Sequence, residues 1–547
     1  ARQALEAARR PAYSSFGLLP MAGPPLFRGR AGAQGSASIL GALGRNVVST
    51  TRDGDKARPG GRGVQDLTVG PIGKTLLIFA MPVLGSNILQ SLNGSANAIW
   101  VSHVLGEAAL TATVNANNIF FLMLGAVFGI SMAANLLISQ SVSGRDLAMV
   151  KRVVGSASTF FLILSLSVGV AGYLLTPTIL DLMQTPPDAR RDAITYLRVI
   201  FAAMPFMYFF SFVMMAQREA GDSRTPFWFS VFAVGLDVML NPLLIMGVGP
   251  FPKMGIAGSA TSTLVSQTLT LAAMIVYLYR TDSVLILKRG DWRLFRPELA
   301  IIRTLVVKGF PMALQMLVIS GAAVVMIRFV NAYGSHVAAG YGAAIQLWTY
   351  VQMPAMALGA AVSSMAAQNV GAGLMDRVSE VARKGVWLAV LMTGLPVALI
   401  YLVEPWVLLL FLPGGSPSTP IAMHINAFAL WGFVPFGMAF VLNGVIRATG
   451  AVWPPLLGLL ISMWLVRIPF AHYLEPTLGQ DAVWWSFPLG SMISLVLAAG
   501  YYRFGGWRKS KLMAGIPRGA APDTGLSPPA IAEETEAVEV AAKAPAE

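Results

Sequence analysis

The sequence predicts an all-α integral membrane protein, and three observations carry that prediction. Of the 547 residues, 55% are hydrophobic and 12% are charged, whereas soluble domains are roughly 25% charged. Continuously apolar stretches of about 20 residues, long enough to cross a bilayer as helices, recur from about residue 75 to residue 504. The landmarks of these stretches also repeat once along the chain. Because the runs do not alternate between apolar and polar residues, a membrane β-barrel is excluded.

We count twelve predicted transmembrane helices, most of them separated by short polar or Pro/Gly-marked breaks. The predicted spans begin near residues 76, 113, 153, 193, 226, 256, 304, 340, 385, 421, 452 and 482. The weakest hydropathy is expected in the Gly- and Pro-containing stretch from Met353 to Val370.

The distribution of basic residues explains the net charge of +13. Loops after even-numbered spans contain fifteen Lys or Arg residues, and loops after odd-numbered spans contain four. This asymmetry predicts that the even loops and both termini are cytoplasmic, and it removes the need for a nucleic-acid partner. We therefore expect a multi-pass protein of the cell membrane, in bacteria the inner membrane. There are no cysteines, so disulfides and Cys metal sites are excluded.

Both ends of the chain differ from the apolar part in composition. Residues 1–70 hold ten Lys or Arg against four acids and have no apolar helical face, which predicts a disordered basic tail. Residues 505–547 are predicted to form a disordered C-terminal tail, because the sequence from about Gly515 is rich in Ala, Pro and Glu.

An internal repeat relates the two halves of the chain at an offset of 229 residues. Four pairs of landmarks share this offset: Pro82 and Pro311, Gly144 and Gly373, Gly221 and Gly450, Pro226 and Pro455. The repeat predicts two homologous six-helix bundles, an N-lobe (residues 71–282) and a C-lobe (residues 304–504), joined by a cytoplasmic linker (residues 283–303). Six spans per half give both halves the same orientation, which places a substrate between them near the midplane.

Over about residues 70 to 505 the sequence resembles the multidrug and toxic compound extrusion (MATE) family. The resemblance rests on the order and spacing of several segments: Pro82 with the following ANAIWVSHVLG, SGRDLAMVKRV, AQREAGDSRTPF at 216–227, GIAGSATSTLVSQ at 255–267, QNVGAGLMDR at 368–377 and NGVIRATGAVWPP at 443–455. The resemblance implies two lobes around a central V-shaped cavity. It also implies export of mostly organic cations in exchange for protons or sodium.

The resemblance transfers the family's ion site only in part. The acid of the family's first helix aligns with Asn97, and the two polar positions of its fifth helix align with Asp237 and Asn241. Family members with a C-lobe site carry acids at positions that align near Ile319 and Phe436, where this chain has none. Asp237, Asn97 and Asn241 are therefore the expected ion-coupling residues, and coupling through the C-lobe is disfavoured.

Asp237 is also the only acid that we place deep within a predicted span. A carboxylate at mid-bilayer costs about 2.5 to 3.5 kcal/mol, so such a group usually faces the protein interior or water. It is either a protonatable coupling site or a structural hydrogen-bond acceptor. Asn93 and Gln90 on the first span are candidate cavity-lining residues that either orient the carboxyl group or join helices.

Two further residues within spans are candidates for function. Pro82 removes a backbone hydrogen bond and is expected to kink the first helix as a hinge, although membrane helices also tolerate proline without moving. Arg467 is a candidate cavity-lining cation that would meet an anionic group, and the alternative is that it snorkels to the interface. The four histidines do not have the spacing of a metal cluster, so no metal or other cofactor is expected.

The remaining classes of function fit the sequence poorly. The GKT at residues 73–75 lacks the glycine that a phosphate loop requires at Thr68, and no constellation of catalytic side chains marks a membrane enzyme. The resemblance therefore implies a secondary active efflux transporter, which we expect to exchange small, cationic or amphipathic compounds for protons or sodium by alternating access, and to act as a monomer. The alternatives are a lipid-linked oligosaccharide flippase and an exporter of an anionic metabolite.

Overall fold

The computed structural model describes residues 65–182, 187–412, 415–510, 512 and 516. Most of the two predicted tails therefore lies outside the described residues. Within the described residues every regular element is helical and no strand occurs, which confirms the all-α prediction.

Six helices make up the first half of the chain, which we call the N-lobe. They are α2 (Ile72–Leu105), α3 (Glu107–Ser143), α4 (Leu147–Leu182), α5 (Pro187–Glu219), α6 (Arg224–Met246) and α7 (Ile256–Arg280). The short helix η1 (Arg289–Phe295) follows α7 and precedes the second half, in the segment predicted as the linker.

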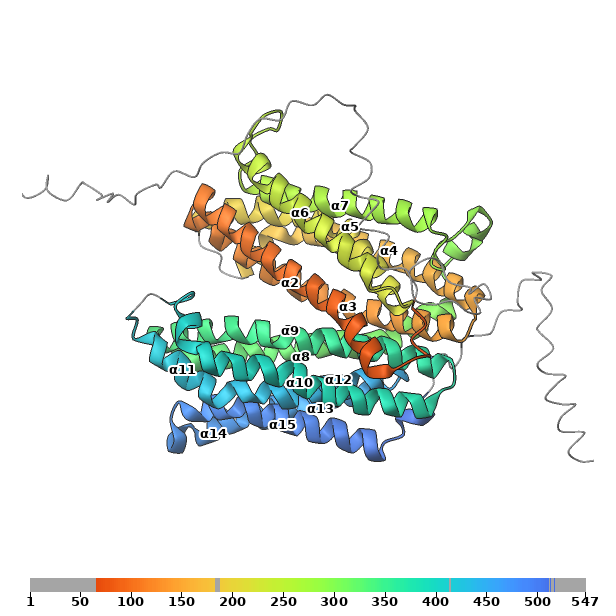
Figure 1. Ribbon diagram of the computed structural model, residues 1–547. Helices are drawn as coiled ribbons and strands as arrows, with labels where there is room; N and C mark the ends of the chain where they lie inside the picture. The colour runs from red at the N-terminus through yellow and green to blue at the C-terminus, as the bar shows by residue number, and fades with distance from the viewer. Residues whose placement is uncertain (1–64, 183–186, 413–414, 511, 513–515, 517–547) are drawn as a thin grey trace, which may run out of the picture. The chain divides into compact units, whose positions relative to one another are not determined.

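The second half, which we call the C-lobe, repeats this order with two of its six members interrupted. Its helices are α8 (Leu299–Ala332), α9 (Ser335–Gly371), α10 (Met375–Leu408), α11 (Ser418–Ala429) with η2 (Leu430–Gly432) and α12 (Phe433–Ala448), α13 (Trp453–Leu460) with η3 (Ile461–Arg467) and α14 (Ile468–Leu478), and α15 (Asp481–Phe504). The short η4 (Trp507–Lys509) follows α15. Figure 1 shows α2–α7 gathered in one group and α8–α15 in another.

The helices account for the twelve predicted spans one by one. Each predicted start lies within, or one residue before, a different helix or interrupted helix. By length and hydropathy, ten of the described helical stretches can cross a membrane, and α3 and α9 are the other two. α9 contains the stretch from Met353 to Val370 that the sequence already marked as weakly hydropathic, and its 37 residues form one unbroken helix.

The interruptions distinguish the lobes. The fourth and fifth helices of the N-lobe, α5 and α6, are continuous, whereas their counterparts in the C-lobe are broken at η2 and at η3. The η3 segment is π-helical, a form that occurs mostly as short insertions within α-helices and often at functional sites.

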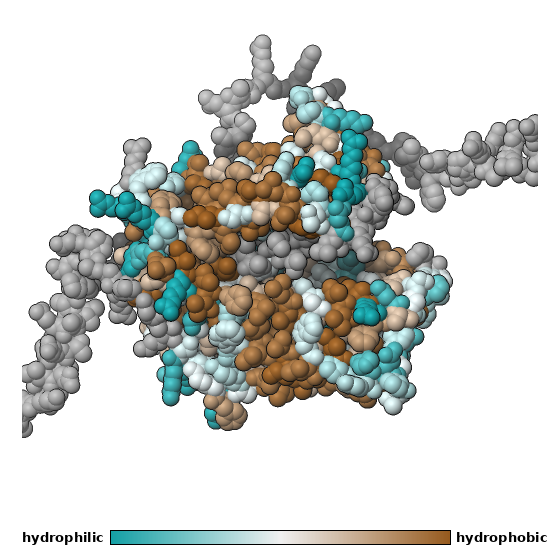
Figure 2. Space-filling view, turned by 180° about the vertical axis from the view of Figure 1, so that it is seen from behind, coloured by the Kyte–Doolittle hydropathy of each residue, from teal (hydrophilic) through white to brown (hydrophobic). Residues whose placement is uncertain are grey.

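The surface of the helices is apolar in the way that lipid requires. Large apolar side chains such as Trp387 (72% exposed), Leu402 (73%) and Val324 (67%) lie outside the core. Such side chains are unfavourable in water when they form a patch, and they suit contact with lipid. Figure 2 shows hydrophobic side chains over the middle of one face and hydrophilic ones gathered toward its ends.

Glycines let the lobes approach each other closely between α3 and α8. A Cβ atom on Gly129 of α3 would lie 2.1 Å from the backbone nitrogen of Ala313 on α8, and one on Gly309 of α8 would lie 2.6 Å from the Cα of Ile130. Small residues at such a contact allow backbones to pack together without a hydrophobic driving force. The close contact between α3 and α8 thus requires glycine, which has no side chain, at both positions.

Candidate functional site

A buried carboxylate in the N-lobe collects hydrogen bonds from two neighbouring helices. Asp237 on α6 is 2% exposed. Its Oδ2 accepts a hydrogen bond from Nδ2 of Asn93 on α2 at 2.9 Å and from Oγ1 of Thr263 on α7 at 3.2 Å. Its Oδ1 accepts a hydrogen bond from Oγ of Ser262 on α7. Three helices therefore converge on one acid, and their donors compensate for the burial of its charge.

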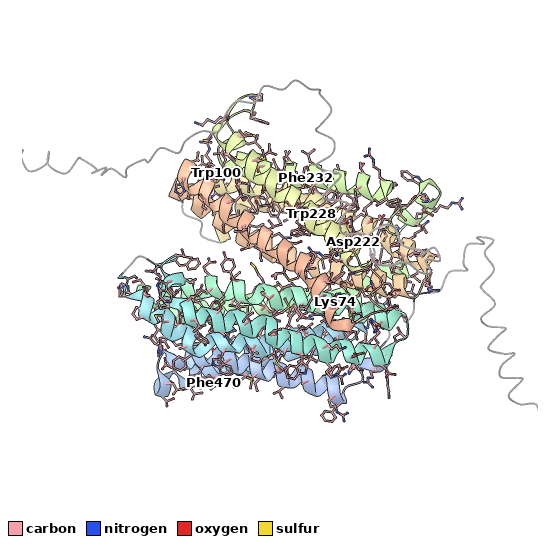
Figure 3. The ribbon with its side chains drawn as sticks, in the orientation of Figure 1. Lys74, Trp100, Asp222, Trp228, Phe232 and Phe470 are labelled. Carbon is pink, nitrogen blue, oxygen red and sulfur yellow. The ribbon has the colours of Figure 1, made fainter. Side chains whose placement is uncertain are left out.

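The local sequence explains why these side chains meet. Residues four apart share a face of a helix, so Asn93 and Asn97 lie together on α2, and Asp237 and Asn241 lie together on α6. α2 packs against α6, and α6 packs against α7. In Figure 3, α2 can be found by the labelled Trp100 and α6 by the labelled Trp228. The three polar faces are thereby turned toward one another.

The other two expected coupling residues lie beside Asp237 without bonding to it. Oδ1 of Asn97 accepts a hydrogen bond from Oγ of Ser259 on α7 at 3.3 Å. Asn241 is 1% exposed, and its Oδ1 has no hydrogen-bond partner in the described part of the chain. The polar cluster therefore contains a carboxylate that is held by donors and an amide oxygen that is still able to accept.

The remaining candidates of the sequence fall outside this cluster. Gln90 is exposed on α2. Arg467, in the π-helical segment of the C-lobe, places its guanidinium carbon 3.5 Å from the centre of the Phe487 ring, and among the described residues its Nε has no hydrogen-bond partner. α2 runs through Pro82 as one helix, and Oγ of Ser86 donates to the Pro82 carbonyl at 3.0 Å.

Sequence reasoning missed the hydroxyl donors of α7. Ser262 and Thr263 belong to the segment GIAGSATSTLVSQ, which carries the family resemblance, and neither was predicted as a site residue. The signal was present, because Ser259, Ser262, Thr263 and Ser266 recur at the spacing of one helix face. Hydroxyls in a span often bond their own helix, so the pattern does not identify a partner without the structure.

Glu404 on α10 is a buried acid of the C-lobe. It is 5% exposed, and its Oε1 accepts a hydrogen bond from Nδ2 of Asn426 at 2.7 Å. Oδ1 of Asn426 in turn accepts from Nε1 of Trp348 at 2.7 Å. No group of three or more His, Cys, Asp or Glu side chains in the described ranges is placed to hold a metal ion.

Two sets of long apolar helices, one of which is built around a hydrogen-bonded carboxylate, are the architecture of a polytopic membrane protein. The family model MatE matches the chain twice, at residues 82–243 and 311–473. The two matches start 229 residues apart, at Pro82 and Pro311, which is the offset of the internal repeat. The chain belongs to the MATE family, whose members are transporters and not enzymes.

Individual relatives cover nearly the whole family region. The probable multidrug resistance protein YoeA of Bacillus subtilis (strain 168) is 34% identical over 442 residues, which is 80% of this chain and 95% of the relative. The probable multidrug resistance protein YpnP of the same organism is 34% identical over 450 residues, 82% of this chain and 98% of the relative. A crystal structure of MATE in the bent conformation superposes with a TM-score of 0.75 at 21% identity, covering 82% of this chain and 98% of that one.

Proposed function

We propose that this transporter exports small cationic or amphipathic compounds from the cytoplasm in exchange for protons, by alternating access of the two lobes. Two relatives that are 34% identical carry names as probable multidrug resistance proteins, which supports a cargo of this kind. The described fold, with two repeated six-helix sets, supports alternating access because such repeats rock against each other around a site between them.

The observation that carries the proposal is the environment of Asp237. Its carboxylate is buried in the membrane region and accepts hydrogen bonds from neutral donors, and within the described part of the chain it forms no ion pair with Lys or Arg. A proton can therefore bind and leave this group, and each change adds or removes one buried charge. Sodium is the alternative ion, and the acceptor oxygen of Asn241 is the feature that favours it.

Pro82 gives the site a route to conformational change. The proline lies on α2 about three turns before Asn93, the α2 residue that holds Asp237. Its ring removes the N–H that would bond the carbonyl four residues earlier. We propose that α2 bends at Pro82 when the Asn93 contact to Asp237 is broken by protonation.

The location and partners follow from the same account. We propose a multi-pass protein of the bacterial inner membrane with both termini in the cytoplasm, acting as a monomer on a small-molecule cargo and protons, with the ion gradient as its energy source and no cofactor. The excess of basic residues in the even-numbered loops supports this orientation.

Arg467 supports a second candidate function, the export of an anionic metabolite or the flipping of a lipid-linked oligosaccharide. No acidic side chain in the described part of the chain forms an ion pair with it. An unpaired guanidinium over an aromatic ring is a suitable contact for a phosphate or carboxylate.

The test is export of ethidium from cells that express the chain or its Asp237→Asn variant, with the proton gradient intact or collapsed and with sodium varied. The proposal predicts gradient-dependent export that the variant loses at equal membrane abundance. Asp181→Asn is the control, since Asp181 pairs with Arg190 at the surface. Absence of ethidium export from the unmodified chain would contradict the cationic cargo, and dependence on sodium alone would replace the proton as the coupling ion.

A further inference from the structure

The last turns of α3 and α9 each bond to the opposite lobe. Nε2 of Gln140 on α3 donates to the carbonyl of Ala448, the last residue of α12, at 2.6 Å. Nε2 of Gln368 on α9 donates to the carbonyl of Glu219, the last residue of α5, at 3.0 Å. The last carbonyls of a helix have no partner within it, so each glutamine supplies a missing donor from across the interface.

The two contacts have equivalent acceptors and donors that are one position out of register. Glu219 and Ala448 are 229 positions apart, which is the repeat offset. The position 229 residues after Gln140 is Asn369, the immediate neighbour of Gln368. Each lobe therefore caps the end of the other lobe's fourth helix with an amide from the end of its own second helix. Such a two-way arrangement is what a closed interface between related halves produces.

The segment just before α2 forms hydrogen bonds at the same interface between the lobes. Leu67 is fully buried, its N–H donates to Oε1 of Gln368 at 3.1 Å, and its carbonyl accepts from Nδ2 of Asn369 at 3.2 Å. Two residues earlier, the N–H of Gln65 donates to the carbonyl of Gly221 in the N-lobe at 3.1 Å. Residues 65–70 thus differ from the disordered tail predicted for them, because their backbone groups are taken up by both lobes.

The same interface contains a close backbone contact and, beside it, buried donors without partners that destabilise the closed arrangement. A Cβ atom on Gly371 would lie 2.1 Å from the carbonyl oxygen of Gln140, so the ends of α3 and α9 are in tight backbone contact. Beside the two capped carbonyls, Arg218 and Arg447 each bury an Nε atom that has no hydrogen-bond partner among the described residues. Leaving such donors unmade costs about 1 to 3 kcal/mol each, and opening would let water reach them.

We propose that Gln140 and Gln368 form a paired amide latch that closes the cytoplasmic side of the transporter between the lobes. The loops that follow α3 and α9 carry Arg145 and Arg377, which places this end of the helices in the cytoplasm by the positive-inside rule. The inference rests on the proposed alternating access, since an opening toward the cytoplasm has to break both glutamine bonds and release Leu67.

The experiment measures the distance between the lobes directly. The chain has no cysteine, so Leu147→Cys at the start of α4 and Leu374→Cys just before α10, both exposed, provide a unique pair of spin labels. Pulsed electron–electron double resonance in lipid nanodiscs, without cargo or gradient, gives the distribution of distances between the two labels, and from it the ratio of long to short distances. Gln140→Leu is expected to raise this ratio about 3- to 10-fold, the effect of one lost hydrogen bond. Gln368→Leu loses the bond to the Glu219 carbonyl and the bond from the Leu67 N–H, so it is expected to raise the ratio further, and the double variant most.

Gln352→Leu is the matched control, because Gln352 lies on α9 more than four turns from Gln368. If a leucine variant does not accumulate, Gln140→Met and Gln368→Met keep the length of the side chain without its donor. Unchanged distance distributions in the folded latch variants, or an equal change in the control, would overturn the latch. Because this readout needs no transport, it is independent of whether Asp237 couples export to protons.

Discussion

The two lobes share a helix order but carry opposite chemistry at equivalent places. In the N-lobe, four polar residues surround or form the carboxylate site: Asn93, Asn97, Asp237 and Asn241. The residues 229 positions later in the C-lobe are Ala322, Met326, Val466 and Phe470. The last of these is labelled in Figure 3, in the C-lobe group of helices. Two halves with the same helix order therefore differ in chemistry: one has a buried polar site where the other has apolar side chains.

The polar groups that the C-lobe does contain are of another kind. Glu404, Asn426 and Trp348 form a chain of fixed neighbours, which suits a structural network. Arg467 immediately follows Val466, the counterpart of Asp237, so the C-lobe has a cation one residue from the place where the N-lobe has an acid. We assign ion coupling to the N-lobe and structural support, or contact with an anionic group, to the C-lobe.

The largest expected effect is the difference between Asp237 of the N-lobe and Glu404 of the C-lobe. Asp237→Asn should lower gradient-driven ethidium export at least about 10-fold, because the carboxyl group of the N-lobe site is lost. Glu404→Gln should retain export within about twofold, since the amide preserves most of the shape. Initial rates at equal membrane abundance measure both. A comparable loss in Glu404→Gln would show that the two lobes share the coupling.

The donors of α7 test how closely the site depends on its geometry. Ser262→Ala removes a hydrogen bond to Asp237 and should reduce the export rate about 3- to 10-fold, the equivalent of one hydrogen bond. Ser266→Ala is the control, because Ser266 is equally buried on α7 but donates to the carbonyl of Thr263 in its own helix. Equal effects of the two substitutions would indicate a general requirement for hydroxyls on α7 and not a site.

The C-lobe network should affect stability and leave transport intact. Asn426→Ala breaks the bonds to Glu404 and Trp348, and one buried donor and one buried carboxylate lose their partner. We expect a loss of about 2 to 3 kcal/mol, seen as a lower thermal unfolding midpoint in detergent. Export per folded molecule should be unchanged, and a specific loss of export would assign this network to the transport mechanism.

The smallest expected effect concerns the junction between the lobes. Hydrogen bonds from Arg152 and from Lys151 hold the pKa of Glu298 and the pKa of Asp291 below their ordinary values. A carboxyl group whose pKa falls on folding stabilises the fold above its unfolded-state pKa of about 4. That stability is lost as the pH falls through the lower folded-state pKa.

The unfolding midpoint should therefore be level between about pH 6 and 8 and should fall below about pH 4. Because both pairs are partly exposed, with side-chain exposures of 15–34%, the contribution is about 0.5 to 1 kcal/mol. Glu298→Gln should lower the midpoint at pH 7 and reduce its fall in acid. A variant with the same acid profile as the unmodified chain would show that the Arg152 pair contributes nothing.

The fold was predictable because a small number of physical rules determine where membrane helices form. Length and hydropathy determine where a span lies, and the constant offset between Pro82 and Pro311 revealed the duplication before any contact was known. Asp237 was predictable as well, because a carboxylate in an apolar helix is costly enough to stand out.

The details of the site depended on packing that no sequence pattern expresses. Asn93 and Asn97 are equivalent by helix face, yet only Asn93 reaches Asp237, since the choice depends on how α2 is rotated against α6. The contact of Gln140 with Ala448 joins residues more than 300 positions apart. Gln140 is an ordinary interhelical amide in type and Ala448 contributes only its backbone carbonyl, so this contact becomes visible only in three dimensions.

Proton flow across the membrane of liposomes that contain the purified protein tests most directly the central claim that Asp237 couples export to protons. Liposomes loaded with a pH-sensitive dye and containing either the unmodified chain or Asp237→Asn receive an ethidium gradient and no sodium. If Asp237 is the coupling acid, the cargo gradient drives proton flow in the unmodified chain and none above background in the variant. Proton flow of equal size in both would contradict the account.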